Sequence, residues 1–477
     1  MTHTDFLTIM PLIILSLAPV IIMLTIAFRR NHAVISGFSM LSFIAAFVSL
    51  IFIVPISPYQ LDSLFVIDGY AIFFMGVIIV SGFFLTLISY HYFEKHDEAK
   101  EEFYILLFLT ALGSSVIVCA NHFVSFFLGL EILSIAAYVL IAYVRKHDWS
   151  IEAAIKYLVM ASLSSAILLF GMGLIYAGTG SMTIKGIENF LDNISVTNPV
   201  VLAGFVMFFV GVGFKLALVP FHMWTPDVYQ GAPAPVAAML ATISKTGVFA
   251  FLLRFFITIY GYRYQGVLTA LTVISIATMF VGNLLAMRQS NVKRILAYSS
   301  IAHMGYLFVA LIAGNKIGLG ASMVYLTVYS LTSLGAFGVI SILSDEKKDA
   351  EEIADYHGLF WKKPGLAIMF TVMLLSLAGM PLTAGFFGKF FLIESGAINQ
   401  KWALIISLVI TSVISLYYYL KIVAAMFARI EADKEQQVFP ALSYALIACL
   451  TFAVLWIGVA PSALIDIISG LIKKIII

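Results

Sequence analysis

The sequence predicts an all-α polytopic membrane protein with about fourteen transmembrane helices, including two inverted five-helix repeats that each contain a discontinuous helix. Of its 477 residues, 62% are hydrophobic and only 11% are charged, unlike the roughly half-apolar, quarter-charged balance of soluble domains. Apolar runs of about 20 residues, long enough to cross a bilayer, follow one another along the chain. At two places a lysine within such a run lies close to a proline that would interrupt the helix, an arrangement that membrane helices tolerate only where it serves a special purpose.

The connections between the apolar runs are mostly short, and no Pro- or Ser-rich linker interrupts them, so a single helical bundle is expected. The first run has neither a basic n-region nor a small-residue cleavage site, and it is expected to be a retained span rather than a signal peptide. The predicted spans are 6–27, 34–54, 69–91, 103–120, 122–143, 152–177, 199–218, 235–259, 267–287, 295–313, 318–343, 365–395, 402–428 and 441–460.

Basic residues in the loops predict that both termini lie outside the cytoplasm. If the N-terminus is outside, the cytoplasmic loops hold Arg29, Arg30, Lys95, Lys100, Arg145, Lys146, Arg288, Lys293, Arg294, Lys347, Lys348, Lys362, Lys363, Arg429 and Lys434. The outer loops hold only Lys185, Arg263, Lys316, Lys401, Lys473 and Lys474. The formal net charge of +2 gives no reason to expect nucleic-acid binding.

The first interrupted span carries a lysine beside a proline. Lys215 lies in the run GVGFKLALVPFHMW, where Pro220 cannot donate a hydrogen bond to the carbonyl of Leu216, so the helix is expected to break near the charge. Lys245 lies midway along the next apolar run. A lysine at the centre of a membrane helix costs about 2.5–3.5 kcal/mol on insertion scales, and such residues are therefore candidates for function. Lysine, unlike arginine, can release its proton when its surroundings change, as a proton relay requires.

The second interrupted span is 365–395, where Gly379, Pro381 and Gly385 precede Lys389. Paired interrupted spans in two halves of a transporter indicate an internal repeat with the ion site at the breaks. Three pairs of polar residues share nearly one offset: Lys215 and Lys389 at 174, Lys245 and Lys421 at 176, and Glu131 and His303 at 172.

This offset predicts two five-helix units, and an odd number of spans per unit would make them inverted in the membrane. The expected divisions are three N-terminal helices in 1–102, the first repeat in 103–259, the second in 260–428, and a last helix and tail in 429–477.

Other ionisable residues within the apolar runs are further candidates. Glu131, in SFFLGLEILSIAAYVL, is expected to pair with Lys215, either as part of a proton path or as a static ion pair that fixes helix packing. His222 and His303 titrate in the physiological range and could relay protons, or they could be hydrogen-bonded packing residues. Lys156 either joins the path or anchors its span at the interface, and the second reading also holds for Arg254 and Lys421.

Cofactor motifs are missing from the sequence. The two cysteines, Cys119 and Cys449, are too few for an iron–sulfur cluster, and the histidines lack the spacing of metal ligands. The chain has no GxGxxG after a strand, no P-loop and no nucleophile elbow. We therefore expect no metal, NADH, flavin or ATP to bind to this chain itself.

Four motifs resemble those of the antiporter-like proton-channel subunits of respiratory complex I. They are FFLGLEILSIAAYVL, GFKLALVPFHMWTPDVYQGAPAPVAAML with SKTGVF, NVKRILAYSSIAHMGY and MPLTAGFFGKFFL, and they follow the family's order over about residues 100–430. The chain is most similar to the N group of these subunits in bacterial NADH–quinone oxidoreductases. The M group has glutamate at the position of Lys389, and the L group has a lateral helix that a chain ending at Ile477 is expected to lack.

The resemblance implies that Glu131 and Lys215 form the family's glutamate–lysine pair, that Lys245 is the central relay and that Lys389 ends the channel. It also implies a multi-pass subunit of the bacterial inner membrane that couples electron transfer from NADH to quinone, carried out in other subunits, to proton pumping. NADH, FMN, iron–sulfur clusters and quinone would be bound by those partners. The expected neighbours are the lipid bilayer and other membrane-arm subunits, including sister antiporter-like subunits.

Two other functions remain open. The large subunit of an Mrp-type cation/proton antiporter, or the membrane arm of a related hydrogenase, would share this fold and these motifs. A sodium site should show clustered carboxylates and carbonyl oxygens at mid-membrane, whereas lysines would repel the ion. A structural scaffold without transport would leave three costly mid-membrane lysines unexplained.

Overall fold

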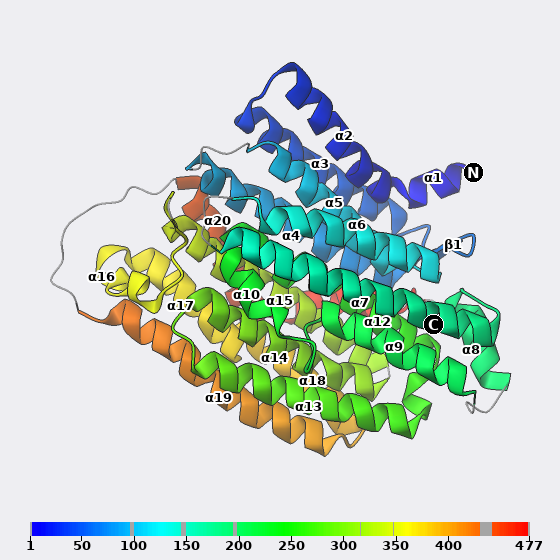
Figure 1. Ribbon diagram of the computed structural model, residues 1–477. Coiled ribbons are helices and arrows are strands. Elements are labelled where there is room, and N and C mark those ends of the chain that lie inside the picture. The colour runs from blue at the N-terminus through cyan, green and yellow to red at the C-terminus, as the bar shows by residue number, and fades with distance from the viewer. Residues whose placement is uncertain are drawn as a thin grey trace.

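Helices form nearly all of the computed structural model, which describes residues 2–95, 100–144, 149–193, 198–314, 316–346, 348–429 and 441–475 (Figure 1). Twelve helices within these ranges are long and apolar enough to cross a membrane. They are α2 (Met10–Phe28), α3 (His32–Ile53), α4 (Gly69–Glu94), α5 (Glu102–Cys119), α6 (Phe123–Ile141), α7 (Ser150–Thr179), the continuous stretch Ala234–Thr258, α13 (Gln265–Met287), α14 (Val292–Ala313), α15 (Lys316–Leu343), α19 (Trp402–Phe427) and α20 (Ala441–Val459).

These twelve helices match twelve of the fourteen predicted spans, with boundaries that differ by four residues at most. The all-α polytopic fold is therefore confirmed. The loop cations Arg145, Lys146, Lys347 and Lys434, which entered the orientation prediction, lie outside the described residues.

The other two predicted spans, 199–218 and 365–395, are interrupted as expected. In the first, α9 (Pro199–Lys215) ends at Lys215, and an irregular segment that contains Pro220 follows before α10 (Trp224–Gly231), which lies beyond the predicted span. The second comprises α17 (Pro364–Ala378) and α18 (Ala384–Ile398), which are separated by 379–383. Gly379 ends α17 at φ +86°, a left-handed conformation that glycine adopts without a steric penalty.

Shorter elements complete the fold. A hairpin of β1 (Tyr59–Leu61) and β2 (Phe65–Ile67) connects α3 to α4, with Gln60 opposite Val66. The stretch Ala234–Thr258 consists of α11 (Ala234–Met239), the π-helical turn η1 (Leu240–Ser244) and α12 (Lys245–Thr258). The remaining short helices are α1 (His3–Thr8), α8 (Ile184–Asn193), η2 (Gly261–Arg263), η3 (Ile353–Tyr356), α16 (Leu359–Lys362) and α21 (Ser462–Ile472).

Two groups of helices share one pattern of neighbours. In the first, α5 packs on α6 and α12, α6 packs on α7, and α7 packs on α9. In the second, α13 packs on α14 and α19, α14 packs on α15, and α15 packs on α17 and α18. The start of α13 lies five crossings after the start of α5, so the second group begins on the opposite side of the membrane. This pattern supports inverted five-helix units, and their boundaries at 103–259 and 260–428 stay a prediction.

The residue offset predicted for the repeat differs from the one in the structure. The second group's α13 begins 163 residues after α5, and its α14 begins 169 residues after α6. More importantly, Lys215 is the last residue of α9, before its break, whereas Lys389 lies in α18, after its break. The two lysines are therefore not equivalent positions. Their near-common offset came from counting residues without knowing the lengths of the segments between the helices.

The spans differ greatly in how deeply they lie in the bundle. The hydrophobic windows of Ala234–Thr258, α14 and α15 are 100%, 94% and 83% buried, whereas that of α2 is 28% buried. In lipid an apolar outer face is stable, so only helices surrounded by protein can hold ionised groups away from the bilayer. The three most buried spans therefore offer the setting in which intramembrane charge is tolerated.

Candidate functional site

Lys215 is the last residue of α9 and lies buried against α6 and α7. Its side chain is 3% exposed, and its Nζ donates a hydrogen bond to Oγ of Ser134, 2.7 Å away on α6. The ammonium also lies 5.9 Å from the ring centroid of Tyr157 on α7. Beyond the break, the indole N–H of Trp224 donates to the carbonyl of Phe214 at 3.0 Å, which provides one partner for the open end of α9.

Glu131 lies one helical turn before Ser134 on α6, and the expected direct ion pair with Lys215 is absent from the described residues. Ser134 accepts the hydrogen bond of the ammonium instead. One carboxylate oxygen of Glu131 is enclosed without a hydrogen-bond partner, and the carboxylate is close enough to act on Lys215 electrostatically. Close packing holds α6 in place, because a Cβ on Gly113 of α5 would lie 2.6 Å from the carbonyl oxygen of Gly129.

Lys245 lies near the middle of the fully buried stretch Ala234–Thr258 and is 1% exposed. It directly follows the π-helical turn η1, a local distortion often found at functional sites because it changes the direction of the next side chains. Its Nζ donates to Oγ of Ser300 on α14 at 2.6 Å and lies 5.9 Å from the ring centroid of Tyr229. The hydroxyl of Tyr329 on α15 donates to the same Ser300 oxygen at 2.6 Å.

His303 lies one turn beyond Ser300 on α14 and is 4% exposed. Its Nδ1 is 2.5 Å from the hydroxyl of Tyr325, and its ring centroid is 5.1 Å from that of Tyr329. His303 acts electrostatically with both Lys245 and Lys389. The histidine is thus a hydrogen-bonded core residue, and it also lies between two buried lysines. Its position is therefore compatible with both predicted roles, a packing residue and a proton relay.

Lys389 on α18 is held by the end of the other half-helix. It is 6% exposed, and its Nζ donates to the carbonyl of Ala378, the last residue of α17, at 2.7 Å. Carbonyls at a helix C-terminus carry partial negative charge and favour a cation. Only a glycine fits beside this lysine, because a Cβ on Gly379 would lie 2.7 Å from its Cδ. The ring centroid of Tyr306 is 5.1 Å from the ammonium.

A small cavity connects His303 with Lys389. It is lined by these two residues together with Tyr325, Tyr329 and Ser376, among others, and its volume is about 10 Å³. A single water molecule needs about 10–15 Å³ and two or more polar partners, so the cavity is at the lower limit for one water.

The interval between Lys215 and Lys245 is less continuous. Tyr229 on α10 is fully buried, and its hydroxyl oxygen has no hydrogen-bond partner of normal geometry among the described residues. The same holds for the hydroxyl of Thr225, one turn earlier. Tyr229 interacts electrostatically with Tyr157, the residue whose ring lies near Lys215. The ring of Tyr229 also lies near the ammonium of Lys245. Tyr229 is thus the polar side chain that contacts Lys245 and also lies near Tyr157, which borders Lys215.

His222 and Lys156 lie apart from this row. His222, in the segment between α9 and α10, is 6% exposed, and neither ring nitrogen makes a hydrogen bond of normal geometry within the described part of the chain. The side chain of Lys156 is 46% exposed and forms ion pairs with Glu152 at 2.8 Å and with Asp227 at 3.0 Å. Its position agrees with an interface residue, as does that of Lys421, which is exposed and donates to the carbonyl of Gln289.

The ion pairs of Lys156 belong to a charged pocket of about 210 Å³ that Asp227 shares with Arg294. Asp227 lies on α10, outside the membrane-spanning helices, and accepts a hydrogen bond from Arg294 at 2.8 Å. Partial burial alone would raise the pKa of Asp227, but hydrogen bonds from Lys156 and Arg294 outweigh that effect and lower the pKa below its usual value.

Two buried ion pairs were not predicted. Arg254, interpreted as a snorkelling residue, is 5% exposed and pairs with Asp68 at 2.6 Å, so that interpretation is wrong. Lys293, expected in a loop, is 1% exposed, pairs with Asp349 at 2.6 Å and donates to the carbonyl of Ala232 at the end of α10. The partners are 186 and 56 residues apart, and no local pattern links them. The one available signal was Asp68, an acidic residue directly before the predicted span 69–91.

The buried lysines and His303, with the hydroxyls around them, can bind and release protons but provide few ligands for a metal ion. In the ranges that the structure describes, no group of three or more His, Cys, Asp or Glu side chains could bind a metal ion. Lys215, Lys245, His303 and Lys389 are titratable, buried, and placed on or beside the most buried spans. Serine and tyrosine hydroxyls contact each of these residues or their neighbours, and hydroxyls can both donate and accept.

The fold and this row of residues define the antiporter-like class of membrane subunits. The sequence profile of the family described as NADH:quinone oxidoreductase/Mrp antiporter, TM matches residues 120–415. The chain belongs to this family.

Solved structures agree. A chain of respiratory complex I from Thermus thermophilus with bound aureothin is 30% identical, with a TM-score of 0.81 over 96% of this chain and 98% of that one. A chain of the archaeal membrane-bound sulfane sulfur reductase is 23% identical, with a TM-score of 0.86 over 99% and 97%. One of the Mrp complex from Dietzia sp. DQ12-45-1b is 18% identical, with a TM-score of 0.86 over 99% and 98%. The last two similarities show the fold alone.

Proposed function

We propose that this chain is a proton-translocating membrane subunit of a bacterial NADH–quinone oxidoreductase, of the N group, and that Lys215, Lys245, His303 and Lys389 carry the protons. The observation that supports this most directly is the row of buried groups from Lys245 to Lys389. Lys245 donates to Ser300, Tyr329 donates to the same Ser300 and lies against the ring of His303, and a small cavity is lined by both His303 and Lys389. Electron transfer from NADH to quinone would take place in partner subunits that hold FMN, iron–sulfur clusters and quinone.

Glu131 would control the first lysine of the path. The carboxylate acts on the ammonium of Lys215 electrostatically, while the ammonium donates its hydrogen bond to Ser134 and not to Glu131. A small movement of α6 or α9 would close or widen the separation of the two groups and change how firmly Lys215 holds its proton. Lys156 lines the charged surface pocket, and the ring nitrogens of His222 make no hydrogen bond of normal geometry with the row within the described residues, so both would have secondary roles.

The test of this path is Lys215→Ala in the assembled complex. Loss of a relay group should reduce NADH-driven proton pumping in proteoliposomes at least about tenfold, because a positioned proton-transfer group typically contributes a factor of 10² or more. NADH–quinone turnover should also fall through coupling. Lys185→Ala, which removes a lysine whose side chain is 69% exposed, serves as the control. Normal pumping by an assembled Lys215→Ala complex would contradict the proposal.

The alternative is a large subunit of an Mrp-type cation/proton antiporter or a related hydrogenase membrane arm. Three ammonium groups along one path would repel a sodium ion, which favours protons. The purified native complex distinguishes the readings: an oxidoreductase should contain flavin and iron–sulfur subunits and acidify proteoliposomes with NADH. An antiporter should exchange Na⁺ for H⁺ without NADH.

The proposed orientation has both termini on the periplasmic side of the inner membrane. Single cysteines at Lys100 and Lys348, in a chain whose Cys119 and Cys449 are replaced by serine, should react with an impermeant maleimide only from the cytoplasm. Lys348 is suited to this because its side chain is 62% exposed. Labelling of either position from outside would invert the proposed path.

A further inference from the structure

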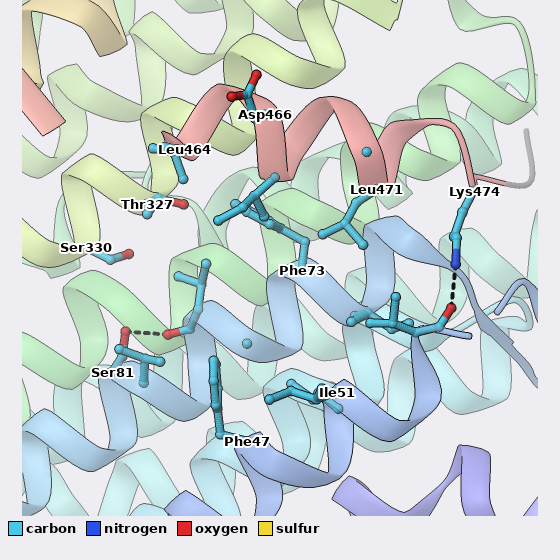
Figure 2. Close-up of a pocket in the computed structure, with 18 of the residues that line it drawn as sticks. Phe47, Ile51, Phe73, Ser81, Thr327, Ser330, Leu464, Asp466, Leu471 and Lys474 are labelled. Carbon is cyan, nitrogen blue, oxygen red and sulfur yellow. Dashed lines mark hydrogen bonds between the residues drawn. The ribbon is translucent and has the colours of Figure 1, made fainter. Parts of the chain in front are cut away.

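An apolar groove runs between α3, α4, α15 and α21 (Figure 2). Its volume is about 700 Å³, and it is lined mainly by Leu, Ile, Val and Phe side chains. Phe47 and Ile51 of α3 and Ile467 of α21 lie on its walls and are 41%, 59% and 58% exposed. The groove is therefore open towards the apolar exterior of the bundle, which in a membrane is lipid.

Short contacts at one end of α21 fix the walls of the groove. The amide of Gly69, at the start of α4, donates to the carbonyl of Lys474 at 3.2 Å, and a Cβ on Gly69 would lie 2.1 Å from the carbonyl oxygen of Leu471. The ammonium of Lys474 donates to the carbonyl of Val54 at the end of α3, at 2.6 Å. These contacts hold α21 against α3 and α4 while leaving the space between them unfilled.

Two glycines keep the groove open. Gly76 on α4 and Gly470 on α21 both line it. A Cβ built on Gly470 would meet no atom within 4 Å, and one on Gly76 would meet only the side chains of Phe47 and Leu50 at 3.8 Å. Larger residues would fit at either position, so the missing side chains leave real space.

The polar side chains of the lining already have partners. Ser81 donates to the carbonyl of Val77 at 2.7 Å, and Thr327 donates to that of Met323 at 2.9 Å. Asp466 is exposed at the rim. These hydroxyls therefore need no hydrogen bond from a molecule in the groove, and an apolar chain fits the groove best.

The length of the groove matches one leaflet of a bilayer. One end lies at Lys474 and Val54, at the end of α3, and the other lies at Ser81 and Ser330, near the middle of α4 and α15. From Ile72 to Ser81 the groove follows nine residues of α4, or about 13.5 Å at 1.5 Å per residue. The hydrocarbon core of a bilayer is about 30 Å thick, so a single leaflet provides about 15 Å.

A partner helix would fit this space poorly. Over the length of about 13.5 Å that the groove follows along α4, a helix about 11 Å across would occupy on the order of 1,300 Å³, well above the 700 Å³ of the groove. A helix would also cross the whole membrane, whereas the groove closes at mid-membrane.

We propose that the groove binds one acyl chain of a membrane phospholipid as a resident part of the subunit. The phosphate lies at the end where Lys473 is exposed and Lys474 has further ammonium protons to donate, since an ammonium has three N–H groups and phosphate accepts them well. The acidic Asp466 lies eight residues before Lys474, in the first half of α21, away from the headgroup (Figure 2).

The floor of the groove lies close to the central lysine. The hydroxyl of Ser330 is 3.4 Å from that of Thr246, the residue after Lys245. An acyl chain above Ser330 excludes water from this side of the helix that carries Lys245. The lipid would thus act as a hydrophobic seal beside the proposed path, although its binding does not depend on that path.

The experiment uses the purified full-length complex, reconstituted with a phosphatidylethanolamine that carries a photoreactive diazirine within one acyl chain. Mass spectrometry should locate the crosslinks on peptides of α4 and α21 that line the groove. Gly470→Leu, and independently Gly76→Leu, should reduce this labelling at least about tenfold, because the leucine takes the space of several buried methylene groups. Gly173→Leu is the matched control, since a Cβ there also meets no atom within 4 Å but lies outside the groove, on the exposed face of α7.

The proposal is overturned if the groove peptides of the wild type are not labelled, or if both leucine variants are labelled like the control. It is also overturned if Ile467→Cys forms an efficient crosslink to a helix of another subunit, since a protein would then cover the groove.

Discussion

Replacing Lys389 by arginine separates the need for charge at this position from the need for a mobile proton. The wild-type ammonium donates one hydrogen bond to the carbonyl of Ala378 at the C-terminus of α17. A hydrogen bond to a charged group contributes about 1.5–3 kcal/mol, and a helix C-terminus adds about 0.3–2 kcal/mol. Making and breaking this contact can therefore change the stability of the protonated form by at most about 5 kcal/mol.

A change of this size is enough to make a lysine release its proton, but it is too small for an arginine. Releasing a proton at pH 7 takes about 4.6 kcal/mol from an ordinary lysine and about 7 kcal/mol or more from an arginine. Lys389→Arg should therefore keep the contact with Ala378 but lose most proton pumping. Lys389→Glu should retain partial pumping, because a buried carboxyl can also titrate, although it can hydrogen-bond to the Ala378 carbonyl only in its protonated form.

The assay compares initial rates of NADH-driven acidification in proteoliposomes at equal amounts of assembled complex. The expected order is wild type, then Lys389→Glu, then Lys389→Arg. Lys185→Arg, a change at an exposed ion pair with Glu188, controls for the substitution itself. An arginine variant that pumps as fast as the wild type would show that position 389 needs only a fixed charge, and would remove it from the path.

Two further predictions concern the charged groups beside the path. Lys293→Met leaves Asp349 buried without its cation and should lower the free energy of unfolding by about 3–5 kcal/mol, measured as a large fall in melting temperature. Adding Asp349→Asn should recover part of the loss. A Lys293→Met variant with an unchanged melting temperature would contradict a structural role for the pair. Asp227→Asn should lower the melting temperature at pH 7, and the difference from wild type should shrink as the pH falls below about 4. Lys156 and Arg294 lower the pKa of Asp227, so the carboxylate stabilises the folded protein at pH values above the ordinary pKa of an aspartate. This stabilisation is lost as the pH falls through the lowered pKa of the folded state. A difference in melting temperature that is independent of pH would refute this reasoning.

The spans and their interruptions could be read from the sequence because both depend on local properties. Runs of apolar residues determine which segments can cross the bilayer, and Pro220 and Gly379 end helices through their own backbone chemistry. The helix α21 was missed because its eleven residues are too short to count as a span.

The candidate lysines were also found from the sequence, but their partners were not. A charge inside an apolar run is visible at once, whereas Ser134 lies 81 residues from Lys215, and Ser300 lies 55 residues from Lys245. Serines are frequent in these helices, and only tertiary packing selects the ones that accept from an ammonium. For the same reason a direct pair between Glu131 and Lys215 was expected, whereas the ammonium of Lys215 donates to the hydroxyl of Ser134.

The partner of Lys389 is a main-chain carbonyl, and this has a consequence for how the protein tolerates mutation. A codon change can delete Glu131 and leave Lys215 without a counter-charge, but no codon change deletes the carbonyl of Ala378. That group persists whatever side chain follows it, as long as the helix stops there. The vulnerable residue at this end of the row is instead Gly379, which has no side chain at all, because any Cβ would press on the lysine and strain the turn. Loss of function here should therefore arise from substitutions at an uncharged position that a search for ionisable residues would pass over.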